Sequence, residues 1–256
     1  MTPPAPWSFF HIVFSLFGLV SAVFFTRLLC SCSPPCEAKE TADRSSFNIL
    51  VLWICGVILA ASEIYKQLFL YKIVNNSQYD WWYFPFQLCS TPMYLCLAFP
   101  LLPRGRPQQA AAAYLQSFGF LGGIMALVEP SGLMHPYWTL TLHGLLWHIL
   151  LIFIACFCCA SGMAGDDNCT FFYTLPLFYF FCLIATAINI LTLGRADMFY
   201  ISPYYPITQV VFHEISVVLG IWPGIIIYLL SICVGAFLCR KLLNFISNKG
   251  FFTKKP

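Results

Sequence analysis

Residues 137–160 read YWTLTLHGLLWHILLIFIACFCCA, a run of 24 residues without a Lys, Arg, Asp or Glu. A helix that spans a bilayer needs about 20 mainly apolar residues, so this stretch predicts a transmembrane helix. The whole chain of 256 residues is 60% hydrophobic and only 9% charged, whereas soluble domains carry roughly 25% charged residues. The composition therefore excludes an ordinary soluble domain and indicates a polytopic membrane protein.

Seven stretches of the chain are long and apolar enough to cross a bilayer. They cover residues 8–29, 47–68, 82–102, 109–128, 137–160, 171–193 and 209–239. The last stretch exceeds one crossing, and we expect Pro223 to kink it. Because the connections are short, the sequence predicts one all-α domain over residues 1–256, a seven-transmembrane helix bundle.

The basic residues predict the orientation of this bundle. The first positive charge, Arg27, follows the first apolar run, which favours a retained helix over a cleaved signal peptide. On one predicted side lie ten cations: Arg27, Lys39, Arg44, Arg104, Arg106, Arg240, Lys241, Lys249, Lys254 and Lys255. The other side receives only Lys66, Lys72 and Arg195. Cytoplasmic loops carry the excess of Lys and Arg, so we expect an outside N-terminus and a cytoplasmic C-terminus.

The same charge distribution bears on partners and location. The net charge of +3 arises mostly from this asymmetry, so it predicts membrane orientation and no nucleic-acid partner. The expected partners are membrane lipids, and the sequence leaves the oligomeric state open. The protein is expected in the plasma membrane of a bacterium, or in the endoplasmic reticulum or another endomembrane of a eukaryote.

Polar side chains within the predicted helices gather at one depth. At about 1.5 Å per residue, they lie roughly 6–11 Å beneath the predicted outer surface. Five helices contribute to this set, which comprises Glu63, Cys89, His143, Asn189, and His213 with Glu214. Strongly polar groups in spanning helices are costly and mark functional sites by default. The pattern predicts a cavity near the outer leaflet, lined by the helices over 47–68, 82–102, 137–160, 171–193 and 209–239.

A thiol and an imidazole at matched depth indicate nucleophilic catalysis. Cys89 would be the nucleophile and His143 the base that removes its proton. Glu214 or Glu63 would orient the imidazole. Gln87, Ser90 and Asn189 are candidate donors to an oxyanion, and the candidate binding residues also include Lys66 and His213.

Each of these residues also has a purely structural interpretation. Cys89 is one of 13 Cys and could be a packing thiol, although Pro85 and Pro92 flank it. Glu63 and Lys66 are three residues apart and could simply neutralise one another. His143 and His148 lie about 140° apart around a helix, which argues against one shared ligand. The sequence predicts neither a metal site nor a cofactor.

A long segment near the C-terminal half adds a possible lid. Residues 193–209 read LGRADMFYISPYYPITQ and form the longest predicted outer loop. The segment is rich in Tyr and Pro, so it could cover the cavity. An aromatic anchor at the membrane interface is the alternative interpretation.

Several motifs, in this order and spacing, resemble a known family. They are FPFQLCS (84–90), GFLGGIMALVEP (119–130), LHGLLWH (142–148), AINIL (187–191), MFYISPYYP (198–206) and LGIWP (219–223). Together they resemble the YwaF-like integral membrane proteins and their animal relatives, the transmembrane acyltransferases that remodel ether phospholipids. The resemblance covers roughly residues 50–235. The androgen-induced lipid hydrolases look similar in architecture but use a Thr nucleophile.

The resemblance implies both a fold and a chemistry. In the animal relatives, a Cys in the third helix and a His in the fifth form the catalytic pair, through an acyl-thioester; the matching positions here are Cys89 and His143. The Glu-x-x-Lys motif corresponds to Glu63 and Lys66. YwaF-like proteins often carry a His where this chain has Gln87, a departure that weakens the transfer of chemistry.

The residues and the resemblance together predict an intramembrane lipid acyltransferase or lipid hydrolase. The alternative is a small-molecule transporter or a substrate-binding membrane component, in which the same polar pocket binds without a covalent step. A receptor is a third option, which the short inner loops disfavour.

Overall fold

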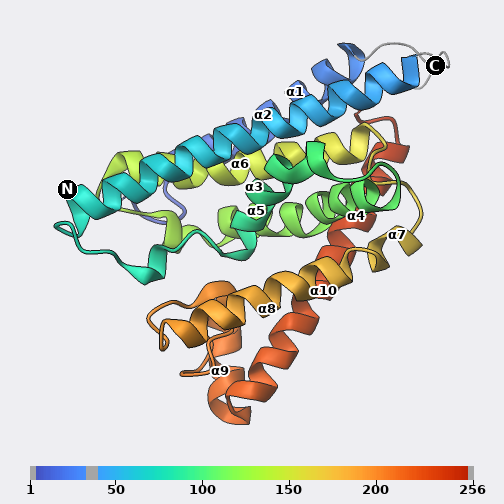
Figure 1. Cartoon of the computed structure of the whole chain (residues 1–256). Helices are drawn as coiled ribbons and strands as arrows, with labels where there is room; N and C mark the ends of the chain where they lie inside the picture. Colours follow the sequence, from blue (N-terminus) through green and yellow to red (C-terminus); the bar gives the residue numbers. More distant parts are fainter. Residues whose placement is uncertain (1–3, 33–39, 253–256) are drawn as a thin grey trace.

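The computed structural model describes residues 4–32 and 40–252, and every regular element within these ranges is helical (Figure 1). Of the cations that predicted the orientation, Lys39, Lys254 and Lys255 lie outside the described residues. The all-α prediction is confirmed for the described part of the chain.

Within the described residues, six helical spans are long and apolar enough to cross a membrane. They are α1 (Phe9–Cys32), α2 (Glu40–Phe69, extended to Val74 by a π-helical turn), α4 with α5 (Arg106–Tyr114 and Phe120–Val128, joined by the π-helical turn Leu115–Gly119), α6 (Trp138–Ala160), α7 with α8 (Cys169–Phe172 and Leu175–Leu191) and α10 (Ile221–Asn248). Two shorter apolar helices accompany them, at Leu88–Leu101 and Val210–Leu219.

The predicted helix over 82–102 is only partly helical. After one 3-10 turn at Trp81–Tyr83, the chain is extended and the helix starts at Leu88. It comprises α3 (Thr91–Ala98) between 3-10 turns at Leu88–Ser90 and Phe99–Leu101. Pro85 accounts for the late start, because a proline pushes the residue before it out of the α region, and Phe84 has ψ 132°.

The predicted helix over 209–239 breaks at Gly220 instead of kinking at Pro223. Gly220 has φ 95°, a backbone conformation that glycine adopts without strain. Helix α9 (Val210–Leu219) ends there and lies against the start of α10. A Cβ at Gly224 would come within 2.6 Å of the Ser216 Cβ, so the two helices touch closely. Pro223 lies in the first turn of α10, where its missing N–H costs no helical bond.

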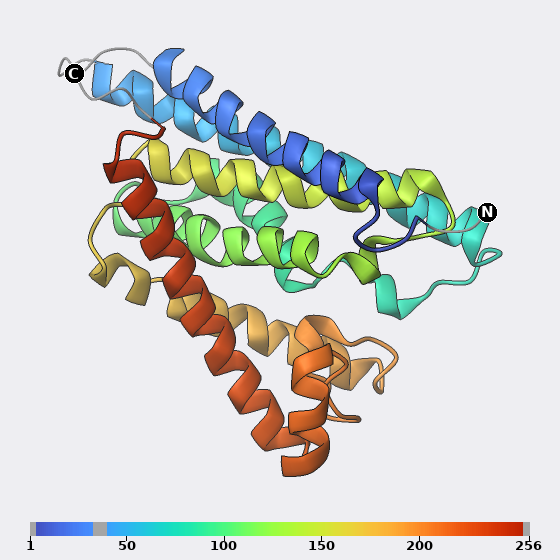
Figure 2. The ribbon, with the colours of Figure 1, turned by 180° about the vertical axis from the view of Figure 1, so that it is seen from behind.

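The helices differ in how much of their surface meets other helices. In α6 and in α4–α5, 61% of the most apolar window is buried, against 22% in α1 and 28% in α10. Helix α6 is therefore central, with α1, α2 and α5 around it, while α8, α9 and α10 form a second layer (Figures 1 and 2). Gly123 permits the close approach of α5 to α6, since a Cβ there would lie 3.1 Å from the His148 carbonyl oxygen.

Candidate functional site

One end of the bundle, formed by residues 75–87, 129–137 and 192–209, holds a cavity of about 200 Å³. We call this the cavity end. The wall comes from α2, the segment before α3, the loop before α6, α6 itself, and Tyr200 of the loop after α8. Its polar members include Glu63, Lys66, Gln87, Cys89, Ser90, His135, His143 and His148. Six residues that the sequence predicted for one site therefore line one cavity, namely Glu63, Lys66, Gln87, Cys89, Ser90 and His143.

Cys89 lies in the first turn of the short helix that starts at Leu88. Its thiol is free, and its backbone is fixed because the Trp147 indole N–H donates to the Cys89 carbonyl over 3.0 Å. Helix α5 passes close behind, since a Cβ at Gly122 would lie 3.6 Å from the Cys89 Cα. The first turn of a helix carries N–H groups without helical partners and the positive end of the helix dipole.

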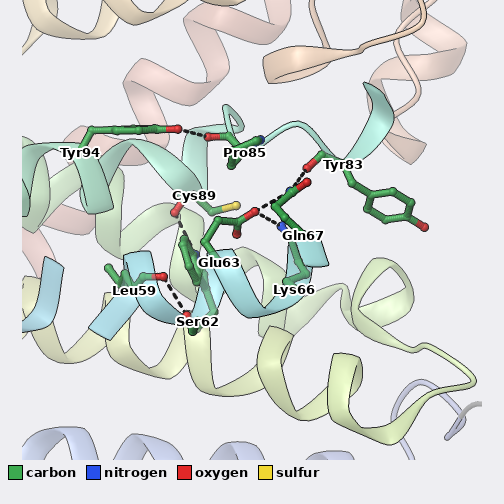
Figure 3. Close-up of polar contacts among 10 residues, drawn as sticks. Leu59, Ser62, Glu63, Lys66, Gln67, Tyr83, Pro85, Cys89 and Tyr94 are labelled. Atoms are coloured by element: carbon green, nitrogen blue, oxygen red, sulfur yellow. Dashed lines mark hydrogen bonds and ion pairs between the residues drawn. The ribbon is translucent and has the colours of Figure 1, made fainter. Parts of the chain in front are cut away.

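The extended backbone before Cys89 is held by side chains from the surrounding helices (Figure 3). The Tyr94 hydroxyl donates to the Pro85 carbonyl over 2.7 Å, and the Gln67 amide donates to the Tyr83 carbonyl over 2.6 Å. Non-helical backbone at membrane depth is tolerated only where protein satisfies it or a cavity adjoins it. Both conditions hold here, because side chains bind this backbone and the cavity adjoins it.

Glu63 forms an ion pair within the cavity wall (Figure 3). The residue is 5% exposed, and its Oε1 lies 2.8 Å from the Lys66 Nζ and accepts a 2.7 Å hydrogen bond from Gln67. In Figure 3 the Cys89 sulfur points toward the Glu63 carboxylate. The pair therefore neutralises itself, as an i, i+3 pair does, and also lines the candidate site.

Two imidazoles reach the cavity from α6. The His143 ring packs on the Trp147 indole, with centroids 5.6 Å apart, and its buried Nε2 has no hydrogen-bond partner. The His148 Nδ1 lies 2.6 Å from the Gly144 carbonyl oxygen. A carbonyl only accepts, so this Nδ1 carries the proton and the Nε2 of the neutral ring is a free acceptor.

His143 and His148 line the same cavity, although their angular separation argued against one shared ligand. The lining residues of α6 are Leu140, His143, Gly144, Trp147 and His148, a stripe with the i, i+3, i+4, i+7 spacing of one helix face. His143 and His148 form the two edges of that stripe. Gly144 lies between them, and because it carries no side chain, the Leu133 side chain packs closely over it.

Residues 4–240 match the profile of the TMEM164 family. The chain belongs to this family. It is accordingly an integral membrane protein, in agreement with its six apolar spans. Neither the comparison with curated proteins nor the comparison with solved structures finds a match. The resemblance to the YwaF-like proteins stays a prediction, because the match to the TMEM164 family does not test it.

The loop between α8 and α9 closes one side of the cavity in this TMEM164-family chain. Gln87 holds it through two hydrogen bonds, a donation to the Asp197 carbonyl and an acceptance from the Phe199 N–H, each 2.8 Å. Phe199 and Tyr200 have φ of 59° and 57°, in the left-handed region that non-glycine residues rarely adopt. Held in this way, the loop presents Tyr200 to the cavity.

Two further side chains support the same loop from within. Asn189 of α8 donates to the Met198 carbonyl over 3.0 Å and accepts from the Met198 N–H over 2.7 Å. The Asp197 carboxylate accepts from the Ser202 N–H and the Thr208 hydroxyl, both at 3.1 Å, while burial raises the pKa of Asp197. Asn189 therefore shapes the wall and does not itself line the cavity.

Helices α8 and α9 contribute no lining residue, contrary to the prediction that both would. Depth alone placed His213 and Glu214 at the site, but the reversal at Gly220 carries α9 away from α6. The His213 Nδ1 lies 2.9 Å from the Ile207 carbonyl oxygen, and Glu214 is exposed. Across residues 4–32 and 40–252, no group of three or more His, Cys, Asp or Glu is placed to hold a metal ion.

A second buried polar cluster, which the sequence analysis missed, lies at the other end of the bundle. Arg240 of α10 is fully buried. Its guanidinium donates to the Gln116 side chain over 2.6 Å and to the carbonyls of Ala164, Gly165 and Asp167. Gln116 in turn donates to Asn244 over 2.6 Å. An Arg well inside an apolar helix could have indicated this cluster. The sequence analysis counted Arg240 only as one of the cytoplasmic cations.

Proposed function

We propose that this TMEM164-family protein is an intramembrane lipid acyltransferase or lipid hydrolase with Cys89 as its nucleophile. The observation that supports this most is the cavity itself, which gathers one free thiol and three imidazoles, two of them from α6. Activated nucleophiles need a base within reach. A cavity bounded by apolar helices also suits a reacting group that arrives on a fatty chain.

We also propose that the chain crosses the membrane seven times, with the N-terminus outside and the C-terminus cytoplasmic. Helix α1 begins and α10 ends at opposite ends of the bundle (Figures 1 and 2), which an odd number of crossings requires. The third crossing combines the helix Leu88–Leu101, about 21 Å long, with the non-helical segment 84–87. Together they supply the length needed for a hydrocarbon core about 30 Å thick.

The proposed reaction has two balanced halves. In the first, the Cys89 sulfur attacks the acyl carbonyl carbon, an S–C bond forms and the ester C–O bond breaks. The thiol proton passes through an imidazole to the leaving alcohol. In the second, a lysolipid hydroxyl or water attacks the thioester and gives its proton to an imidazole. The acyl group then leaves as a new ester or a free acid, and the protonated imidazole returns the thiol.

The imidazoles of His143 and His148 are the candidates for the proton transfers of this cycle. His143 is the base inferred from the resemblance, and its Nε2 is unpartnered. The Nε2 of His148 is a free acceptor, and its ring is fixed by the Gly144 carbonyl, as an orienting group fixes the ring in a catalytic triad. We assign proton transfer at Cys89 to this pair. Glu63, paired with Lys66, replaces Glu214 as the nearby acidic group.

The test is acyl transfer to the protein from a phospholipid with an alkyne-tailed acyl chain, supplied in vesicles. Wild type should form an adduct that neutral hydroxylamine releases, as it releases thioesters. Cys89→Ser should lose that adduct, and His143→Ala and His148→Ala should each strongly reduce it. Cys96→Ala is the matched control, because Cys96 is a buried thiol on the same short helix.

Two outcomes would decide against an enzyme. Equal labelling in wild type, Cys89→Ser and both His variants would remove the covalent mechanism. An intact small ligand that co-purifies with wild type and with Cys89→Ser, in the absence of any adduct, would favour the transporter or binding component over the acyltransferase.

A further inference from the structure

A third imidazole, that of His135, lines the Cys89 cavity and has no part in the proton transfers assigned above. His135 lies in the loop between α5 and α6, at the cavity end, whereas His143 and His148 belong to α6. The chain around His135 fixes both the place of this ring and the position of its proton, and these two features indicate what the ring does.

The backbone of His135 is fixed by the start of α6. The His135 N–H donates to the Thr141 Oγ1 over 2.9 Å, and the same hydroxyl donates to the His135 carbonyl over 3.1 Å. Thr141 is fully buried. Pro136 restricts the chain further, because its ring fixes its own φ and limits the conformations of the residue before it. The imidazole is therefore held by α6, although it belongs to a loop.

A neighbouring backbone N–H sets the tautomer of this ring. The Tyr137 N–H donates to the His135 Nδ1 over 3.1 Å, and the two rings stack with centroids 5.5 Å apart. Because Nδ1 accepts, the neutral ring carries its proton on Nε2. Burial lowers the pKa of His135, which favours the neutral ring at neutral pH. The hydrogen bonds of His135 within the described residues use its N–H, its carbonyl and Nδ1, so the Nε2–H is left for a ligand.

His148 has the opposite tautomer. Its Nδ1 donates to the Gly144 carbonyl, so its Nε2 accepts. The cavity therefore contains one ring that can take up a proton and another, His135, that can donate a hydrogen bond while it stays neutral. Acyl transfer needs both kinds of group, a base for the thiol and a donor for the oxygen that becomes negative. A neutral imidazole can serve as that donor.

The donors that the sequence predicted for this oxygen leave room for another. Asn189 does not line the cavity, and the Gln87 side chain is bound to the loop after α8 through both its nitrogen and its oxygen. Ser90 remains at the wall. The cavity has a volume of only about 200 Å³, so an acyl group on Cys89 places its carbonyl oxygen in the small space that His135 also borders.

We infer that His135 donates its Nε2–H to the acyl carbonyl oxygen while Cys89 attacks the carbonyl carbon. The inference rests on the proposed acyl-transfer function. In the attack an S–C bond forms, the C=O π electrons move to the oxygen, and the thiol proton passes to an imidazole of α6. When the tetrahedral intermediate collapses, those electrons return, the ester C–O bond breaks and the alcohol leaves with that proton. His135 keeps its own proton throughout.

Substitutions at His135 and His148 separate a donor from a base. The measured quantity is the rate of acyl transfer from the alkyne-tailed phospholipid. His135→Leu should slow it about a hundredfold, as for one lost oxyanion donor. His135→Gln should restore most of the rate, because its amide nitrogen takes the place of Nε2, whereas His135→Asn, which places its amide nitrogen near Nδ1, should not.

The matched control is His148→Gln, which should be as slow as His148→Ala because an amide takes up no proton. Equal rates for His135→Gln and His135→Leu would overturn the inference, and so would a wild-type rate in His135→Leu. Melting temperatures of the His135 variants, measured in detergent, should agree with one another.

Two reactions of Cys89 that have no leaving alcohol separate this inference from the proposed function. A fatty trifluoromethyl ketone adds to the thiol and creates an oxyanion, whereas a fatty-chain iodoacetamide alkylates the thiol and creates none. His135→Leu should bind the ketone at least tenfold more weakly and should be alkylated at the wild-type rate. Cys89→Ala, the control, should show neither reaction at this position.

Each outcome of this comparison decides the inference. Equal affinity of wild type and His135→Leu for the ketone would overturn it. Equal losses in ketone binding and in alkylation would also overturn it, because they would show a general disturbance of Cys89. If wild type binds the ketone through Cys89 but transfers no acyl group, the proposed function fails, and the affinities for the ketone still decide the role of His135.

Discussion

The two buried polar clusters of this protein lie at opposite ends of the bundle and are built in opposite ways. Around Cys89 the polar groups surround a hollow, and the Nε2 of His143 has no partner. Around Arg240 the two terminal guanidinium nitrogens donate to four acceptors in Gln116 and the chain from Ala164 to Asp167, and the Nε alone has no partner. Arg240 lines neither the 200 Å³ cavity at Cys89 nor the 590 Å³ cavity at Arg195.

This difference indicates that the cluster around Cys89 is a binding or reaction site, whereas the cluster around Arg240 holds helices together. Hydrogen-bonded polar groups in a packed interior fix one arrangement of the helices. Removing one partner leaves a buried donor or acceptor without a hydrogen bond, which lowers the free energy of unfolding. Polar groups around a hollow keep lone pairs available for a ligand, and they stabilise the fold less. Changes around Arg240 should therefore affect stability most, whereas changes at the cavity end should affect reactivity as well.

The largest expected effect is on stability, around Arg240. Arg240→Leu should lower the free energy of unfolding by about 3–5 kcal/mol, because it orphans several buried acceptors. The control is Lys241→Leu, which removes the exposed cation next in sequence and should have little effect. Thermal unfolding in detergent measures both, and equal melting temperatures would break the comparison.

The next effect concerns the ion pair at the cavity end. Glu63→Gln should destabilise the protein by about 1–3 kcal/mol, since it leaves the Lys66 ammonium without its partner, and should reduce acyl labelling at least tenfold. In the double variant Glu63→Gln with Lys66→Met, stability should recover while labelling stays low. If labelling recovers together with stability, the pair has only a structural role.

A smaller effect is expected where Gln87 holds the loop. Gln87→Leu removes two hydrogen bonds, to the Asp197 carbonyl and from the Phe199 N–H. It should cost about 1–2 kcal/mol and make residues 192–209 more sensitive to protease. Gln108→Leu, which removes one hydrogen bond to the Leu102 carbonyl, is the control and should leave the loop resistant. Unchanged cleavage in Gln87→Leu would contradict the assignment of this residue as the loop's anchor.

The smallest expected effect tests the placement of the nucleophile. Trp147→Phe keeps an aromatic ring beside His143 but removes the donor to the Cys89 carbonyl. The loss should be about 0.5–1.5 kcal/mol in stability, with a several-fold slower rate of labelling at Cys89. A labelling rate equal to that of wild type would show that this hydrogen bond does not position the thiol.

Much of the candidate site followed from the sequence because α2 and α6 are regular helices that run to the same end. Residue count then converts directly into depth, which brought Glu63 and His143 to one level. The method failed where the chain is irregular. Counting along a presumed straight helix gave no warning of the reversal at Gly220, which carries His213 and Glu214 away. It also gave His148 no role, because the angle of about 140° from His143 argued only against one shared ligand, whereas both rings line one cavity.

The sequence by itself determined that the chain is a helical membrane protein and where its apolar segments lie, because the length and polarity of a segment are local properties that decide whether it partitions into lipid. Only the tertiary structure decided which polar groups meet. Whether Asn189 faces a ligand or a loop, and whether Arg240 is a surface charge or a buried group that holds helices together, depends on contacts between residues far apart in the chain. Chain reversals and close helix approaches set those contacts, and no local pattern encodes them.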